Sequence, residues 1–242
     1  MPAVGTSPIV DWDRGWPLWS DLVRYYPSGV HRRRLIVSWL SPHAPASVLD
    51  AGCGPGDLLA AVRDRLPGAA FCGVDQSAGV VAANRARLPW ARFERVDLER
   101  EHLPERFDAV VCSEVLEHIA DDRAALAHLA AMTGRLLLLT VPAGPVLPLE
   151  RGFGHLRHYR LDALSGEIEA LGFGIVRAQA WGFPWMTLFK RASNLRPDAV
   201  MKGFAAVEWS AWKRGLGLAL TGLFYGNLPF AGPQLLVLAE RR

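Results

Sequence analysis

Residues 48–59 read Val-Leu-Asp-Ala-Gly-Cys-Gly-Pro-Gly-Asp-Leu-Leu, and this stretch decides the fold. Its apolar start predicts a short buried strand that ends in the carboxylate of Asp50. Gly52, Gly54 and Gly56 provide the positive φ angles and the close backbone approach that a sharp turn from strand to helix requires. A helix that starts in this way presents N–H groups and a positive dipole end to an anion. The stretch therefore predicts a site for a ligand with an anionic group and a cationic centre.

Strand and helix patterns alternate through residues 46–142. Strands are predicted near 47–51, 71–75, 92–96, 107–112 and 135–141, and helices near 56–66, 78–88 and 121–132. This alternation predicts a parallel sheet with helices on both faces. Ligands of such sheets bind at the carboxyl ends of the strands, so functional residues are expected there.

Further elements flank the alternating region. A helix is predicted from Val30 to Leu40, with Ser28 as its cap. Its basic run, residues 31–34, is expected to form a solvated face; the alternative is a contact with a phosphate or an anionic membrane. After residue 142, a helix is predicted over 161–171, and two strands near 175–181 and 234–240.

Acidic residues stand where the second and third predicted strands end. Asp75 closes the second strand, and a carboxylate there can accept hydrogen bonds from both hydroxyls of a ribose. The alternative role of Asp75 is to cap the following helix. Gln76 comes next in the chain, where it could line a base. Asp97 follows the third strand, either as a ligand-binding residue or as a solvated turn acid.

Length and composition exclude several classes of protein. The 242 residues predict one domain with a full core, and a net charge of +3 does not indicate binding to nucleic acid. Three cysteines without Cys-x-x-Cys spacing favour a reducing, cytoplasmic setting and argue against structural zinc, so no metal is expected. The N-terminus does not have the pattern of a signal peptide. The most apolar segment, 215–224, is too short to span a membrane.

Three motifs carry a resemblance to a known family. The acid-x-Gly-x-Gly-x-Gly pattern from Asp50 to Gly56 resembles that of the class I S-adenosylmethionine (SAM)-dependent methyltransferases. Residues 116–118, Leu-Glu-His, and the segment 154–160 resemble motifs of the small-molecule and quinone-type subgroup. The resemblance covers about 46–181 and 234–240. It implies an α/β, Rossmann-like fold with a mostly parallel seven-stranded sheet, helices on both faces and an antiparallel final strand pair.

The resemblance also implies a SAM site, from which S-adenosylhomocysteine would leave as product. The cofactor-binding residues that it implies are Asp50, Gly52, Cys53, Gly54, Asp75, Gln76, Asp97, Leu98, Ser113 and Glu114. Among them Asp97 would contact the adenine amino group and Leu98 would pack on the ring. In-line displacement at a sulfonium requires no metal, and holding the reactants in line could supply about 7–11 kcal/mol.

Three residues, His155, His118 and Tyr159, are the leading candidates for catalysis, with His158 as an alternative to Tyr159. His155 is the first choice for a general base, and Tyr159 or His158 is the next. The alternative is that their segment only fixes the loop through hydrogen bonds. His118 is either a structural residue or a base near the acceptor, because the pKa of histidine suits proton removal near neutrality.

The chain divides into an N-terminal arm and helix, residues 1–45, and a SAM-binding domain, residues 46–242, with an insertion at 182–233. The arm is expected either to cover the core or to form a lid, because it carries the aromatic residues Trp12, Trp16, Trp19, Tyr25 and Tyr26. The insertion is rich in aromatic residues and is expected to be helical, with Trp209 and Trp212 on one helix face. It is either a helical cap or dimer contact, a wall of an acceptor pocket, or a surface that rests on a membrane.

These features predict an enzyme that transfers methyl groups to an apolar or aromatic small molecule, such as a natural-product intermediate. Membrane contact is not expected, and a homodimer is left open. One alternative is a methyltransferase for lipid-type acceptors at a membrane surface, and another is a protein that binds SAM without transferring methyl. An NAD(P)-dependent reductase is disfavoured by Asp57 in the glycine motif and by the absence of a Tyr-x-x-x-Lys pair.

Overall fold

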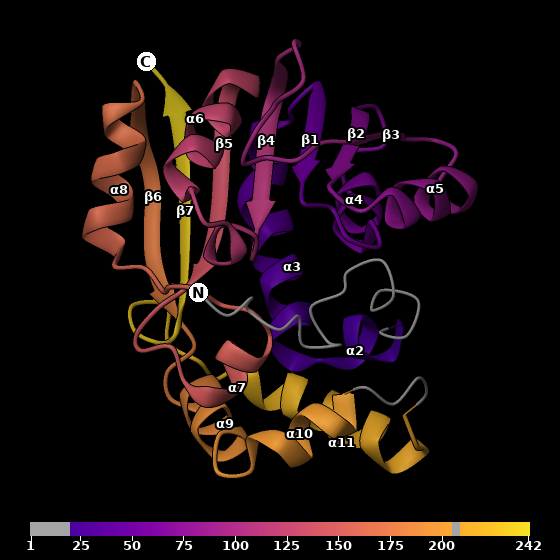
Figure 1. Ribbon diagram of the computed structural model, residues 1–242, viewed down its shortest axis with the longest axis vertical. Helices are drawn as coiled ribbons and strands as arrows, with labels where there is room; N and C mark the ends of the chain where they lie inside the picture. Colours follow the sequence, from indigo (N-terminus) through magenta and orange to yellow (C-terminus); the bar gives the residue numbers. More distant parts are fainter. Residues whose placement is uncertain (1–19, 205–208) are drawn as a thin grey trace, which may run out of the picture.

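A seven-stranded sheet forms the centre of the computed structural model, which describes residues 20–204 and 209–242 (Figure 1). The strands are β1 (Ser47–Ala51), β2 (Ala70–Asp75), β3 (Arg92–Arg95), β4 (Phe107–Ser113), β5 (Thr133–Pro142), β6 (Phe173–Trp181) and β7 (Gln234–Arg241). Their order is β3-β2-β1-β4-β5-β7-β6. Strands β1 to β5 pair in parallel, whereas β7 runs antiparallel to both β5 and β6. The fold class expected from the sequence is therefore confirmed.

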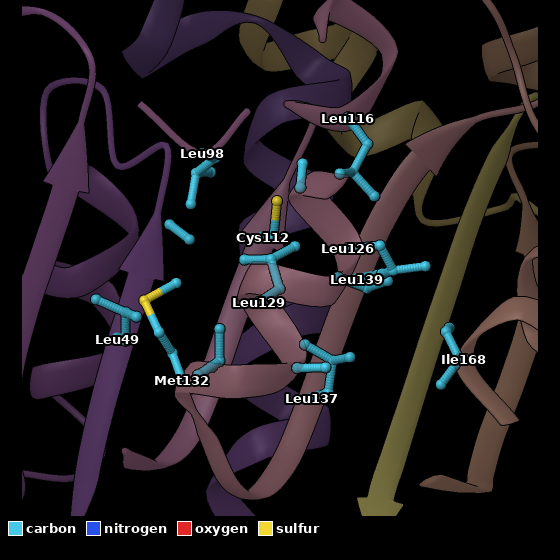
Figure 2. Close-up of a cluster of buried hydrophobic side chains, with 14 of the residues drawn as sticks. Leu49, Leu98, Cys112, Leu116, Leu126, Leu129, Met132, Leu137, Leu139 and Ile168 are labelled. Carbon is cyan, nitrogen blue, oxygen red and sulfur yellow. The ribbon is translucent and has the colours of Figure 1, made fainter. Parts of the chain in front are cut away.

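Helices cover both faces of the sheet because neighbouring residues of each strand point to opposite sides. On one face, α6 (Asp122–Met132) and α8 (Leu161–Ala170) pack on Leu137 and Leu139. Figure 2 shows this cluster, in which Leu129 and Ile168 come from the two helices. On the other face, α3 (Pro27–Leu40), α4 (Asp57–Arg63) and α5 (Ala78–Arg87) pack on Leu136 and Leu138.

The insertion folds into three helices, α9 (Trp185–Ser193), α10 (Pro197–Phe204) and α11 (Ala211–Phe224). Figure 1 shows them below the sheet, where the parallel strands end, together with α2 (Ser20–Tyr25) and α7 (Pro148–Gly152). Phe224 anchors α11 in the same core cluster as α3. Short 3-10 turns, η2 (Ser41–His43) and η3 (Leu116–His118), complete the structure. In the part of the chain described, every helix is too short or too polar to cross a membrane.

Two predictions about helices are wrong, and both depend on where a helix starts. Helix α3 begins at Pro27, so Ser28 lies inside it and is buried rather than acting as its cap. Proline suits the first helical position because its missing N–H costs nothing there. Helix α11 begins only after Trp209, whose backbone N–H donates to Oδ2 of Asp21 (2.7 Å). Trp209 is buried, whereas Trp212 is 71% exposed, so the two do not share a helix face.

The basic run of α3 is only in part the solvated face that was expected. His31 is fully buried and its Nε2 lies 2.7 Å from the carbonyl oxygen of Thr221 in α11. Arg32 reaches the end of β4, and Arg34 remains exposed. Of the aromatic residues predicted to pack in the N-terminal arm, Trp12, Trp16 and Trp19 lie outside the described residues, and Tyr25 and Tyr26 are partly buried.

Candidate functional site

The glycine turn after β1 has the backbone geometry that the sequence predicted. Gly52, Gly54 and Gly56 have φ angles of 77°, 48° and 75°. A Cβ on Gly52 would lie 2.3 Å from Cγ2 of Val115, so a glycine is needed there for space as well as for conformation. The N–H groups of Gly52 and Cys53 both donate to the carbonyl oxygen of Val74 (2.8 and 2.9 Å). These two N–H groups are thus used inside the protein. The anion cradle that the motif predicts involves the N–H groups at the start of α4, and it stays a prediction.

Asp75 is fixed at the end of β2 by two backbone hydrogen bonds. Its Oδ2 accepts from the N–H of Gly54 and its Oδ1 accepts from the N–H of Ser77, both at 3.0 Å. The cap of α5 is Ser77, whose side chain accepts from the N–H of Val80. Ser77, and not Asp75, therefore caps α5, so the alternative role of Asp75 is wrong. A carboxylate has about four acceptor sites, so these two bonds do not exclude a ligand.

A smaller cavity of about 160 Å³ opens beside Asp75. Apolar side chains of Val96, Leu98 and Ile119 form part of its wall, and Asp97 adds a second carboxylate. Six residues that the sequence implicated in cofactor binding line this cavity, namely Gly52, Asp75, Gln76, Asp97, Leu98 and Glu114. The combination of an apolar slot and two carboxylates suits a base attached to a ribose.

Asp50 is a buried carboxylate at the end of β1. It is 2% exposed, and its Oδ2 has no hydrogen-bond partner among the described residues. Burial raises the pKa of Asp50 to about 7, and the nearby carboxylate of Asp75 adds to this shift. A buried carboxylate without a partner is costly, so the position favours a ligand that brings a positive charge.

A larger cavity of about 350 Å³ lies between the glycine turn and the insertion. Helix α9 contributes Met186, Phe189 and Lys190 to its wall, and α3 contributes Arg32 and Arg33. The predicted cofactor residues Asp50, Gly52, Cys53, Gly54, Ser113 and Glu114 line it as well. The two cavities have three lining residues in common, Gly52, Glu114 and His118. They therefore meet at the carboxyl ends of β1 and β4.

Arg32 connects α3 to the end of β4, a role that its place in a basic run did not reveal. Its Nε donates to Oγ of Ser113 (3.1 Å), and its Nη1 lies 3.4 Å from Oε2 of Glu114. Glu114 has a φ of 57° and accepts a hydrogen bond from Nε2 of Gln234 at 2.7 Å. These bonds hold the Glu114 carboxylate at the junction of the two cavities.

Two of the three predicted catalytic residues line the larger cavity. The rings of His118 and His155 are 4.8 Å apart between centroids and nearly perpendicular. Burial, with the positive groups nearby, lowers the pKa of His155 to about 2, and burial also lowers the pKa of His118. Both imidazoles are therefore neutral at physiological pH. Nδ1 of His155 lies 3.0 Å from Nε2 of His158.

Tyr159, the third candidate, is placed elsewhere. Its hydroxyl donates to Oδ2 of Asp122 (2.8 Å) at the start of α6, and it lines neither cavity. Its backbone N–H donates to the carbonyl oxygen of Pro142, which fixes the loop after β5. The hydrogen bonds of Tyr159 thus match the loop-fixing alternative.

Comparisons with known proteins agree with this architecture. A family model described as "Methyltransferase domain" matches residues 49–134. A trans-aconitate 2-methyltransferase from Deinococcus radiodurans is 33% identical over 190 residues, which is 76% of this chain and 67% of that protein. Another, from Methylobacterium nodulans, is 36% identical over 101 residues, which is 42% of this chain and only 36% of the relative.

A solved structure of similar fold is the magnesium protoporphyrin IX methyltransferase from Synechocystis with bound S-adenosylhomocysteine. It has a TM-score of 0.58 and 19% identity, and the alignment covers 88% of this chain and 83% of that one.

Proposed function

Since the chain belongs to the class I SAM-dependent methyltransferases, we propose that it methylates an apolar or aromatic small molecule bound in the larger cavity. The observation that carries this proposal is the junction of the two cavities at Gly52, Glu114 and His118. A two-reactant enzyme needs its partners to meet in one place, because orientation supplies much of the rate enhancement. The sheet order, with an antiparallel β7, also differs from the 3-2-1-4-5-6 order of dinucleotide-binding folds.

The residues present suit the family's cofactor, SAM. Asp75 and Asp97, which both line the smaller cavity, would hold the ribose and the adenine. The unpartnered Oδ2 of Asp50 would accept from the ammonium group, and Arg33 in the same cavity would attract the carboxylate. When bound, SAM supplies a methyl group on a sulfonium, which is a good leaving group.

The larger cavity supports an acceptor with both apolar and polar parts. Leu58, Leu149, Phe153, Met186 and Phe189 give it a largely apolar wall. Such walls, with a few placed polar groups, are usual for small-molecule sites. Two relatives are named for trans-aconitate, whose carboxylate oxygens can accept a methyl group. We propose that the acceptor of this chain is also methylated on oxygen. His118 and His155 would face that oxygen as neutral imidazoles.

His155 is proposed to contact the acceptor and not the cofactor. An imidazole with a pKa of about 2 is a weak proton acceptor, so it would serve as a general base only for an acidic acceptor. His155→Ala is expected to lower kcat by about 10²-fold or more and to leave SAM affinity unchanged. Steady-state kinetics beside calorimetric SAM titration would measure both, and normal turnover in this variant would remove His155 from the mechanism.

The cofactor is tested by calorimetric titration of the protein with SAM, S-adenosylhomocysteine and NADPH. Asp75→Asn is expected to lose SAM binding, whereas Asp162→Asn, an exposed carboxylate on α8, should retain it. Binding of NADPH, or SAM binding that is equal in both variants, would contradict the assignment. The acceptor is then sought by mass spectrometry, with trans-aconitate and hydroxylated aromatic compounds as probes. SAM binding without any methylated product across the panel would favour a non-transferring SAM protein.

A lipid-type acceptor at a membrane surface is the second candidate. It is supported by apolar side chains that the insertion leaves exposed, among them Leu195 (81%), Trp212 (71%) and Phe230 (72%). Cosedimentation with anionic vesicles tests it, with Trp212→Ser as the variant. Binding that the variant loses would favour the lipid acceptor, and no binding by the unaltered protein would favour the soluble small molecule.

A further inference from the structure

Three side chains with metal-binding atoms meet on the wall of the larger cavity. Glu117 and His118 come from η3 after β4, and His155 comes from the loop after α7. One potential ligand atom from each lies within 4.8 Å of the others. All three residues line the larger cavity, so the cluster is accessible from one side.

The hydrogen bonds described for the cofactor site and the fold do not involve the buried carboxylate of Glu117. Its side chain is 0% exposed, and neither carboxylate oxygen has a hydrogen-bond partner in residues 20–204 and 209–242. Nε2 of His118 lies 4.0 Å from Oε1 of Glu117, which is beyond hydrogen-bond distance. Buried carboxylates are normally paired with a charge or bound to a metal. The carboxylate and the two imidazoles together make such a binding set.

We propose that Glu117, His118 and His155 bind a divalent transition-metal ion. Two imidazoles and one carboxylate, with a fourth position open to the cavity, are a ligand set that zinc uses in catalytic sites. Imidazole ligands favour zinc, cobalt or nickel over magnesium and calcium, which prefer oxygen. Tetrahedral bonds of about 2.0–2.2 Å place ligand atoms about 3.3–3.6 Å apart, so the three side chains draw together on binding. This proposal departs from the sequence-based expectation of no metal.

The surroundings of the cluster fix its members in the way that metal ligands are usually fixed. Nδ1 of His155 lies 3.0 Å from Nε2 of His158, whose own Nδ1 lies 3.2 Å from the carbonyl oxygen of Gly144. These two contacts leave Nε2 of His155 available to the metal. Contacts of this kind orient the imidazoles that bind metals. The N–H of Leu156 donates to the carbonyl oxygen of Glu117 (2.8 Å), which joins the two ligand-bearing segments.

The open fourth position suits an oxygen of the acceptor, and this part of the inference rests on the proposed function. A cation there would hold the acceptor oxygen near the junction of the cavities. His118 provides the connection, because it belongs to the cluster and lines both cavities. The binding of the metal itself does not depend on methyl transfer, so the two proposals are tested separately.

The test uses untagged full-length protein that has been treated with a chelator and then titrated with Co²⁺, with absorbance of the d–d bands as the signal. One equivalent is expected to bind, with bands typical of four-coordinate cobalt, and Zn²⁺ is expected to displace it. Glu117→Gln and His155→Ala are expected to weaken Co²⁺ binding at least 10-fold. His43→Ala, a histidine on η2 outside the cluster, should bind as the unaltered protein does.

Two readouts keep the result from depending on folding or on activity. SAM binding by calorimetry should persist in Glu117→Gln, which shows that the variant is folded. No saturable Co²⁺ binding in the unaltered protein, or equal binding in all four proteins, would overturn the metal site. If the metal also holds the acceptor, chelation should abolish turnover and one equivalent of Zn²⁺ should restore it. Full turnover after chelation, with metal binding intact, would overturn only the acceptor role.

Discussion

Asp50 couples the protonation of the cofactor site to the stability of the fold. Its carboxyl is 2% exposed, and burial raises its pKa to about 7 from an ordinary value near 3.8. Because the folded pKa is the higher one, the folded chain keeps a proton between about pH 4 and 7 that the unfolded chain has lost. The stability that this proton supplies is complete below about pH 4 and is lost as the pH rises through 7.

Asp50→Asn removes this titration. Relative to the unaltered protein, the variant is expected to gain about 2–3 kcal/mol in free energy of unfolding between pH 5 and pH 8, because one pKa unit corresponds to about 1.4 kcal/mol. Urea unfolding at the two pH values measures the difference. If the difference in free energy of unfolding between the variant and the unaltered protein is the same at both pH values, the Asp50 carboxyl titrates normally. Asp162→Asn, an exposed carboxylate, serves as the control.

At the residue scale, the sequence predicts which types of side chain gather at the strand ends but not which of them are buried. Asp50, Asp75 and Asp97 could be found because each stands where a predicted strand ends. Glu117 could not, because its burial depends on the loop around His155, which is distant in sequence. Arg32 was missed for the same reason, since its partner Ser113 is 81 residues away.

The turn between β1 and α4 shows how strongly a single element constrains a residue. Gly52 has a φ of 77° and would bring a Cβ within 2.3 Å of Val115. Gly172, at the end of α8, has a φ of 91° but would meet no atom within 4 Å. The two glycines therefore differ in contact and not in backbone conformation.

Gly172→Ala is expected to cost about 1–2 kcal/mol of stability, the strain of a left-handed residue alone. Gly52→Ala is expected to cost about 1–3 kcal/mol more because of the overlap with Val115, and to weaken SAM binding as well. Chemical denaturation and calorimetric titration measure the two effects. Adding Val115→Ala to Gly52→Ala should recover part of the loss. Equal costs for the two single variants would mean that the turn yields without strain.

At the element scale, periodicity predicted the strands and the helices α3, α4, α5, α6 and α8, and helix starts were the weak point. The cap of α6 is Asp121, a residue type typical of this position, and its side chain accepts from the N–H of Ala124 at 3.0 Å. Helix α11 instead starts after Trp209 because Asp21 in α2 binds the backbone there. Such a start is set by a tertiary contact, and the local pattern around Trp209 contains no sign of it.

The contact of α11 with α3 is one of those that attach the insertion to the rest of the molecule. His31 lies at its centre, fully buried, with its ring 4.5 Å from that of Tyr225 and 6.0 Å from that of Phe224. Its Nε2 lies 2.7 Å from the carbonyl oxygen of Thr221. Because α9 and α11 belong to the same insertion, this contact also supports one wall of the larger cavity.

Protonation of His31 should loosen the insertion. Burial lowers the pKa of His31, with the charge of Arg34 adding to the effect, so the unfolded chain takes up the proton first as the pH falls. The stability linked to neutral His31 is therefore present above the ordinary pKa of about 6.5 and is lost as the pH falls below it. This dependence is opposite in sign to that of Asp50, so the two effects oppose each other below about pH 6.5.

His31→Gln keeps a side chain that can donate to Thr221 but cannot titrate in this range. The variant is expected to be less stable than the unaltered protein at pH 8, because it loses the ring contacts, and to lose less stability than the unaltered protein between pH 7 and pH 5. Urea unfolding gives the global effect, and hydrogen exchange in α11 shows whether the loosening is confined to the insertion. His43→Gln is the matched control. If both variants follow the pH profile of the unaltered protein, the acid sensitivity lies elsewhere, and the insertion is held by apolar contacts whose strength does not depend on charge.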